Sequence, residues 1–264
     1  MSLLDEIVKN KTREIRQQVR KKPISELLER VRGQRKPNSF SEVLRNEKVV
    51  QIIAEIKRAS PSAGSLREHF EPVEIAESYK KNGAAAISVL TDERFFAGSL
   101  DYLRHVRMAV DMPLLRKDFI LDPYQVIEAR VFGANAVLLI MAILSNSQFS
   151  ELRAAAKELN LDCLVEVHNS KELERAMMAE PTIVGVNNRD LTTFEVDLSI
   201  TEKLLEIIPE EIIIVSESGI KSRKDVEFLG QSGVDAVLIG EALMRHADVG
   251  KALSKFVGAE KWSR

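Results

Sequence analysis

Eight short apolar runs, separated by amphipathic segments, constrain the fold of this chain more than any other feature. The runs recur from Val49 onward at intervals of roughly 20–30 residues, a spacing typical of successive βα units. They occupy residues 50–56, 84–90, 113–117, 135–140, 162–167, 182–187, 211–217 and 234–240. Continuous apolar runs of this length form parallel strands that helices cover. Eight such units predict an α/β fold, the (β/α)8 barrel.

A doubly wound open sheet is the alternative fold. Such a sheet usually has fewer strands and a glycine-rich fingerprint after the first one, and no G-x-G-x-x-G follows Lys57.

The length of 264 residues suits one barrel, so we expect residues 1–264 to form a single domain. Residues 1–45 carry only helical patterns, punctuated by Gly33 and Pro37. We expect this segment to be a helical extension over the catalytic face of the barrel.

Net charge and the length of the apolar runs argue against a nucleic-acid-binding or membrane protein, and cysteine content indicates the compartment. The formal net charge is −2, which provides no basic field for nucleic acid. The basic stretch 9–22 is interrupted by Glu14 and has the spacing of an ordinary amphipathic helix. The longest apolar run, residues 136–144, is too short for a membrane span. Cys163 is the only cysteine, which fits a reducing cytoplasm. We expect a cytoplasmic protein with no nucleic-acid or membrane partner, and a monomer.

Polar residues stand at the carboxyl ends of the predicted strands, where barrel enzymes place their active sites. They are Glu55, Lys57, Lys117, Glu166, Asn187, Arg189 and Glu217. Residues i and i+2 of a strand share one face, so Glu55 and Lys57 lie on the face opposite Ala54 and Ile56. The apolar face fits the helix layer, which directs the charged pair toward the barrel axis. The alternative is a network of salt bridges that closes the mouth of the barrel without catalysis.

Two glycine-containing motifs predict a phosphate site. Ser218 and Gly219 follow the seventh strand, and Gly240 and Glu241 follow the eighth. Barrels often bind phosphate with these two loops and a helix N-terminus. The backbone N–H of Glu241, not its carboxylate, would then face the phosphate. The alternative is that these glycines only permit tight turns.

The motifs taken together resemble one family. EIKRASPSAG, LLRKDFILDPYQV, LVEVHN, GVNNRDL, SESGI and LIGEALM stand in the order and spacing of indole-3-glycerol phosphate synthase, over nearly the whole chain. The resemblance implies an enzyme without metal or cofactor. Its substrate would be a phosphorylated small molecule, 1-(2-carboxyphenylamino)-1-deoxyribulose 5-phosphate. The reaction would be ring closure, decarboxylation and dehydration to indole-3-glycerol phosphate in tryptophan biosynthesis.

The resemblance also implies roles for individual residues. Lys117 matches the general acid, and a crowded cationic site could lower its pKa toward useful values. Lys57, Glu166 and Glu55 resemble the groups that serve dehydration. Asn187 and Glu217 resemble residues that position the substrate hydroxyls and Lys117. Ser60 and Arg189 could hold the substrate carboxylate or another anion.

Three phenylalanines at the same rim could enclose an aromatic ring. Phe95 and Phe96 follow the second strand, and Phe119 follows Lys117. Ordinary packing beneath the loops is the alternative for each of them.

Two other functions compete with this interpretation. One is a Schiff-base aldolase that uses Lys57 or Lys117, and the other is a barrel that binds a phosphorylated metabolite without catalysis. The four histidines, His69, His105, His168 and His246, lack metal-ligand spacing and are interpreted as ordinary surface or packing residues. Cys163 alternates with Leu164 and is expected to face the helix layer.

Overall fold

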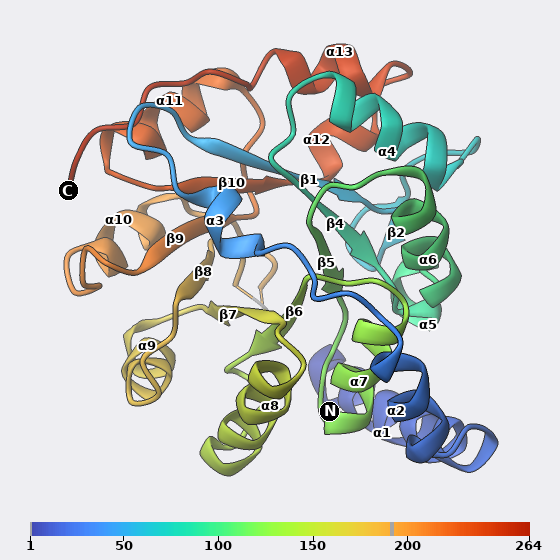
Figure 1. Ribbon diagram of the computed structural model, residues 1–264. Helices are drawn as coiled ribbons and strands as arrows, with labels where there is room; N and C mark the ends of the chain where they lie inside the picture. The colour runs from blue at the N-terminus through green and yellow to red at the C-terminus, as the bar shows by residue number, and fades with distance from the viewer. Residues whose placement is uncertain (1, 191–192) are drawn as a thin grey trace.

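The computed structural model describes residues 2–190 and 193–264, so Leu191 of the GVNNRDL motif lies outside the described residues. Eight parallel strands close into a barrel in the order β1-β10-β9-β8-β7-β6-β5-β4 (Figure 1). They are β1 (Gln51–Ile56), β4 (Ala86–Leu90), β5 (Leu114–Lys117), β6 (Ala136–Ile140), β7 (Asp162–Val167), β8 (Ile183–Asn187), β9 (Ile213–Glu217) and β10 (Ala236–Ile239). Each strand lies within one of the eight predicted apolar runs, and the predicted barrel is confirmed.

Helices surround the barrel and connect successive strands (Figure 1). They are α4 (Pro72–Lys81), α5 (Glu93–Phe96), α6 (Leu100–Ala109), α7 (Pro123–Val131), α8 (Asn146–Glu158), α9 (Ser170–Met177), α10 (Ser199–Leu205), α11 (Arg223–Gln231), α12 (Glu241–Met244) and α13 (Val249–Ser254). Local sequence sets many of their boundaries. The side chain of Asp122 caps α7 ahead of Pro123, and Ser145 and Gln148 form a capping box at the start of α8.

Strand alternation divides the apolar residues between two cores. Ala54 and Ile56 belong to the outer core, between the barrel and its helices. Ile53, Leu115 and Leu164 belong to the inner core on the barrel axis. Cys163 packs against the outer core, as the alternation predicted. Burial raises the pKa of its thiol to about 12, so it is not a reactive thiolate.

The three helices of the N-terminal segment lie in three different places. They are α1 (Leu3–Lys21), α2 (Ile24–Arg32) and α3 (Phe40–Leu44). α1 contributes Leu3, Leu4 and Ile7 to the large cavity at the catalytic face. α2 lies on the outside of the barrel, where Leu27 packs with Tyr124 of α7.

The third helix, α3, lies at the end of the barrel opposite the catalytic face (Figure 1). Phe40 and Leu44 are fully buried in the inner core. Asp162, the first residue of β7, accepts hydrogen bonds from the backbone N–H groups of Phe40 and Ser41 at 2.7 and 2.8 Å. The expected position over the catalytic face therefore does not apply to α3, because its apolar side chains fill the barrel interior at the amino ends of the strands.

A small hairpin follows β1. β2 (Ala59–Ser60) and β3 (Gly64–Ser65) pair antiparallel. Gly64 adopts φ of 64°, a left-handed conformation that favours glycine. The hairpin carries Ser60 and Ser62 to the wall of the cavity.

None of the helices in residues 2–190 and 193–264 is both long and apolar enough to span a bilayer.

Candidate active site

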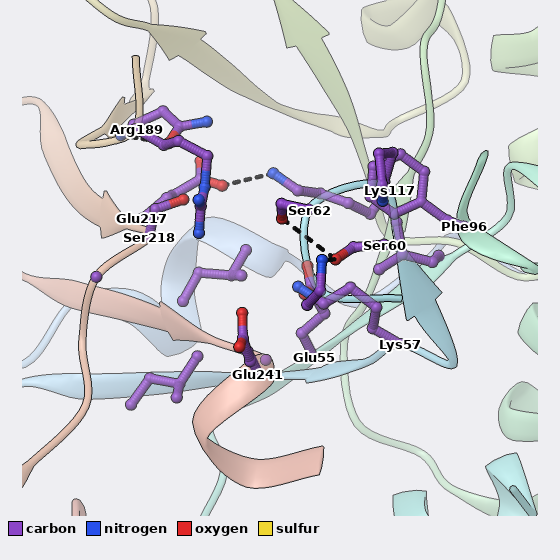
Figure 2. A pocket seen from close by; sticks show the side chains of 18 of the residues that line it. Glu55, Lys57, Ser60, Ser62, Phe96, Lys117, Arg189, Glu217, Ser218 and Glu241 are labelled. Carbon is purple, nitrogen blue, oxygen red and sulfur yellow. Dashed lines mark hydrogen bonds and ion pairs between the residues drawn. The ribbon is translucent and has the colours of Figure 1, made fainter. Parts of the chain in front are cut away.

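A cavity of about 910 Å³ opens at the carboxyl ends of the strands. Figure 2 shows side chains from several strands that point into it, including Glu55, Lys57, Lys117 and Glu217. Glu166 and Asn187 also line it. The structure thus brings together all six residues expected to serve catalysis, although they are spread over more than 160 positions of the sequence (from 55 to 217).

Lys117 lies at the centre of this group, between two carboxylates. Its Nζ donates to Glu166 Oε2 at 3.0 Å and to Glu217 Oε2 at 2.5 Å. Asn187 Nδ2 donates to the other oxygen of Glu166 at 3.2 Å. Lys117, Glu166 and Glu217, which we call the Lys117 cluster, are nearly enclosed by protein. Two carboxylates on two other strands therefore fix the direction in which the ammonium points.

The prediction that the pKa of Lys117 is lowered is wrong. Burial acts to lower this pKa, but the attraction of Glu166, Glu217 and Glu55 outweighs it and holds the pKa above its usual value. The neighbours that the sequence suggested as cations are mostly carboxylates in space. Lys57, another lysine of the cavity, is engaged with Glu55. Lys117 is therefore an ammonium group at neutral pH in the unliganded protein.

The two carboxylates of the Lys117 cluster differ from each other. Burial acts to raise the pKa of Glu166, but Lys117 and then His168 outweigh it and the pKa lies below its usual value. Burial raises the pKa of Glu217 to about 7; Lys117 opposes this rise and the nearby charge of Glu166 adds to it. Glu217 Oε1 is also buried without a hydrogen-bond partner among the described residues. Two carboxylates that share one cation repel each other, so the pKa of one falls and the pKa of the other rises.

Glu55 and Lys57 form a second acid–base pair across the cavity. Lys57 Nζ is 2.7 Å from Glu55 Oε1, and both side chains face the barrel axis as the alternation predicted. Glu55 is 3% exposed, so its charge depends on the lysine for compensation. The cavity therefore holds two separately anchored ammonium groups.

The loops after β9 and β10 form the part of the cavity where a phosphate was expected. Ser218, Gly219, Gly240 and Glu241 all line it. Ser218 and Gly219 adopt φ of 66° and 86°, consecutive left-handed residues that turn the chain sharply after β9. Gly240 has a negative φ, so no turn demands a glycine there.

Gly240 instead makes room for the side chain of Glu55. A Cβ atom at this position would collide with Glu55 Oε1. Glu241 lies at the start of α12 (Figure 2), and its carboxylate accepts two hydrogen bonds from the Arg245 guanidinium at 2.8 and 2.9 Å. This pairing offsets the negative charge of Glu241 beside the expected phosphate position.

Two of the three expected phenylalanines form an aromatic wall of the cavity. Phe96 and Phe119 line the cavity, with ring centroids 6.1 Å apart and planes at 41°. Phe95 is not among the lining residues; its ring instead lies 5.2 Å from the Arg94 guanidinium. Consecutive residues of a helix point about 100° apart, so α5 can direct only one of the two rings into the cavity. Phe96 and Phe119 thus lie at the cavity as expected, whereas Phe95 does not.

Ser60 and Arg189 both line the cavity, as expected. Ser60 Oγ accepts from the backbone N–H of Ala63 at 3.2 Å and so also closes the β2–β3 turn. The Arg189 guanidinium donates to the carbonyl oxygen of Phe194 at 3.2 Å, and its backbone N–H donates to Asn187 Oδ1 at 3.1 Å. Arg189 is thus held by neighbouring backbone groups.

The sequence interpretation missed His168. Its Nε2 is 3.3 Å from Glu166 Oε1, and its Nδ1 is 3.0 Å from Glu172 Oε2. Burial acts to lower the pKa of His168, but the contacts of its ring with the Glu166 and Glu172 carboxylates outweigh it and raise the pKa to about 10. The alternation Leu164, Glu166, His168 contained the signal, because it places this histidine on the same face as Glu166.

The part of the chain that the structure describes offers no group of side chains suited to bind a metal ion. Within residues 2–190 and 193–264, no three His, Cys, Asp or Glu side chains are grouped to hold a metal ion. The carboxylates of Glu55, Glu166 and Glu217 are instead engaged by Lys57 and Lys117.

Comparison with known proteins gives a family and close relatives. The family model described as indole-3-glycerol phosphate synthase matches residues 4–256. The indole-3-glycerol phosphate synthase of Acetivibrio thermocellus is 44% identical over 256 residues, which cover 96% of this chain and 98% of that protein. The protein of the same name from Thermoanaerobacter pseudethanolicus is 46% identical over 98% of each chain.

Solved structures support the fold alone. The 3-hexulose-6-phosphate synthase of Salmonella typhimurium superposes with a TM-score of 0.64 at 13% identity, over 78% of this chain and 96% of that one. At this identity the likeness extends to the barrel and carries no argument about chemistry.

Proposed function

The chain belongs to the indole-3-glycerol phosphate synthase family, and from this premise we propose which of its residues carry the reaction. The activity is that of a carboxy-lyase in tryptophan biosynthesis. The observation that carries the assignment of roles is the Lys117 cluster. It supplies a buried ammonium group, aimed by two carboxylates, beside an aromatic wall.

In the first step Lys117 acts as the general acid. The ring carbon that bears the carboxylate bonds to the ketone carbon, and Lys117 donates a proton to the ketone oxygen, which becomes a hydroxyl. Loss of carbon dioxide then restores the aromatic ring. A pKa held above its usual value keeps Lys117 protonated for this step, and the proton moves only as charge develops on the oxygen.

In the last step the hydroxyl leaves as water, which requires an acid for the oxygen and a base for a proton. Lys57 is the acid in this proposal because it is the second anchored ammonium group, held by Glu55. Glu166 is the base, since its pKa lies below the usual value and it is ionised. Asn187 and Glu217 position Glu166 and Lys117 through the hydrogen bonds already described.

Binding is divided among three parts of the cavity. Phe96 and Phe119 receive the aromatic ring, and Ser60 and Arg189 the substrate carboxylate. The phosphate binds at the loops with Ser218, Gly219, Gly240 and the backbone N–H of Glu241. The Arg189 guanidinium and the two left-handed residues after β9 support this division.

We also propose a cytoplasmic monomer whose extension 1–45 belongs to the same domain as the barrel.

The experiment that tests this function follows indole fluorescence after the protein is mixed with 1-(2-carboxyphenylamino)-1-deoxyribulose 5-phosphate. The wild-type protein is expected to produce indole emission with a chelator present. Lys117→Ala should lower kcat by roughly a thousandfold, the range of a lost general acid with its electrostatic contribution. Lys224→Ala, an exposed lysine of α11, is the matched control and should behave as wild type.

The same samples discriminate the aldolase alternative. An ammonium group lacks the free electron pair that a Schiff base requires, so borohydride with substrate should leave Lys117 and Lys57 unmodified. A trapped adduct, or full turnover by Lys117→Ala, would contradict the proposed roles.

A further inference from the structure

Lys11 is a buried cation that the proposed mechanism does not use. It lies on α1 and is 5% exposed. Its Nζ is 2.8 Å from Asp92 Oδ2, 2.9 Å from Asp118 Oδ1 and 3.0 Å from Glu14 Oε2. Asp92 and Asp118 belong to the barrel, in the segments that follow β4 and β5. One side chain of the N-terminal helix therefore holds two neighbouring loops of the catalytic face.

Both aspartates hold an aromatic residue of the cavity in place. Asp92 Oδ1 accepts from the backbone N–H of Phe95 at 2.8 Å and so caps α5, the four-residue helix that carries Phe96. Asp118 Oδ1 accepts from the backbone N–H of Phe119 at 2.8 Å. Phe96 and Phe119 are the two rings that form the aromatic wall.

The two aspartates depend on Lys11 to different degrees. Asp118 Oδ2 also accepts from Thr91 Oγ1 at 2.6 Å and from the Arg116 guanidinium at 3.1 Å. Asp92 Oδ2 has no hydrogen-bond partner in the described residues, and its charge is offset only by the ion pair with Lys11. Asp92 is fully buried. Without Lys11 this carboxylate would be unpaired, so it would move toward water or take up a proton.

We propose that Lys11 is a positioning residue for the aromatic wall: through Asp92 and Asp118 it sets Phe96 and Phe119, and so the binding of the substrate's aromatic ring. The proposal rests on the function given above, because the ring belongs to that substrate. It assigns the N-terminal helix a definite task at the site, carried out by one buried ammonium group.

The chain offers a matched control two residues away. Lys9 lies on the same helix but is exposed, and none of the ion pairs found in residues 2–190 and 193–264 includes it. Lys9→Met and Lys11→Met remove the same charge from the same helix. A difference between the two variants therefore reports the buried contacts and not the net charge of α1.

The experiment measures binding of the two halves of the substrate separately, by calorimetric titration with anthranilate and with inorganic phosphate, together with kcat and KM. Lys11→Met is expected to weaken anthranilate binding and to raise KM by about tenfold, the scale of a lost aromatic contact. Phosphate binding should stay within about twofold of wild type, because the loops after β9 and β10 do not contact Lys11. Lys9→Met should match wild type in every measurement.

A double variant keeps the test valid if Lys11→Met fails to fold. Lys11→Met with Asp92→Asn removes the unpaired charge, while the amide oxygen still caps α5. It should fold and still bind anthranilate weakly, because α1 no longer holds the segment with Phe119.

Three outcomes would overturn the proposal. They are unchanged anthranilate binding in Lys11→Met, equal weakening of anthranilate and phosphate, and a double variant that binds anthranilate as wild type does. Failure of the proposed function is a separate result: wild-type protein would then produce no indole, whatever the titrations of Lys11→Met gave.

Discussion

At the scale of single residues, His168 links the carboxylate of Glu166 to the stability of the protein. Its pKa of about 10 in the folded state compares with 6.5 for an ordinary histidine. Below pH 6.5 the ring is protonated in both states, and its contribution to stability is complete. Between pH 6.5 and 10 the folded state binds more protons than the unfolded state, so the free energy of unfolding falls as pH rises.

His168→Gln should reduce this pH dependence. Where only the folded state is protonated, His168 can change the free energy of unfolding by about 1.4 kcal/mol per pH unit. The variant lacks this contribution. Urea unfolding at intervals between pH 6 and 10 measures the slopes, with the exposed His105→Gln as control. Equal slopes for His168→Gln and wild type would show that Glu166 and Glu172 do not hold the proton.

At the scale of elements, strand β8 carries a glycine whose place in the site becomes visible only in the barrel. Gly185 pairs in register with Glu166 of β7 and with Val215 of β9. A Cβ atom here would collide with Glu217 Oε1 and lie 3.2 Å from Leu164 Cδ1. The strand therefore leaves a gap in its inward face, which the buried carboxylate of Glu217 fills.

Gly185→Ala should displace Glu217 and release one of the two carboxylates that aim Lys117. We expect kcat to fall by roughly a hundredfold, since a small misplacement of a catalytic group has an effect of this order. The melting temperature should fall by only a few degrees, roughly the cost of one extra methyl in a packed interior. Gly33→Ala, where no atom lies within 4 Å of the new methyl group, should leave both quantities unchanged. Wild-type kcat in Gly185→Ala would mean that Glu217 does not position Lys117.

At the scale of the whole molecule, the N-terminal segment serves both ends of the barrel. α1 borders the catalytic cavity, whereas α3 closes the opposite end with Phe40 and Leu44. A truncation of residues 1–45 would remove both and could not separate binding from stability. In barrel enzymes, residues at the carboxyl ends of the strands serve function and those at the amino ends serve stability. In this chain one contiguous segment, residues 1–45, contributes to both ends.

Phe40→Ala should therefore destabilise the protein without affecting catalysis. Loss of a fully buried phenylalanine typically lowers the free energy of unfolding by roughly 3–5 kcal/mol, while KM should stay within about twofold of wild type because the catalytic face is at the other end. Urea unfolding and steady-state kinetics measure the two effects. Phe228→Ala, 39% exposed on α11, is the control and should change neither. A raised KM in Phe40→Ala would contradict the separation of the two ends.

The sequence by itself determined the barrel and most of its site. The period of the apolar runs fixed eight strands, and the alternation within them directed Glu55, Lys57, Lys117 and Glu166 inward. Both signals are local, because strand geometry sends every second side chain to the same face. Motifs that match a family then predicted the substrate and the roles of these residues.

The tertiary structure alone decided how those side chains are paired. The charges around Lys117, the choice of Phe96 over Phe95 and the contacts of Lys11 depend on residues far apart in the chain. A pKa follows from distance and burial, and neither is encoded in the spacing of residues along a sequence. The sequence could place a lysine at the carboxyl end of a strand, but only the closed barrel surrounds it with carboxylates.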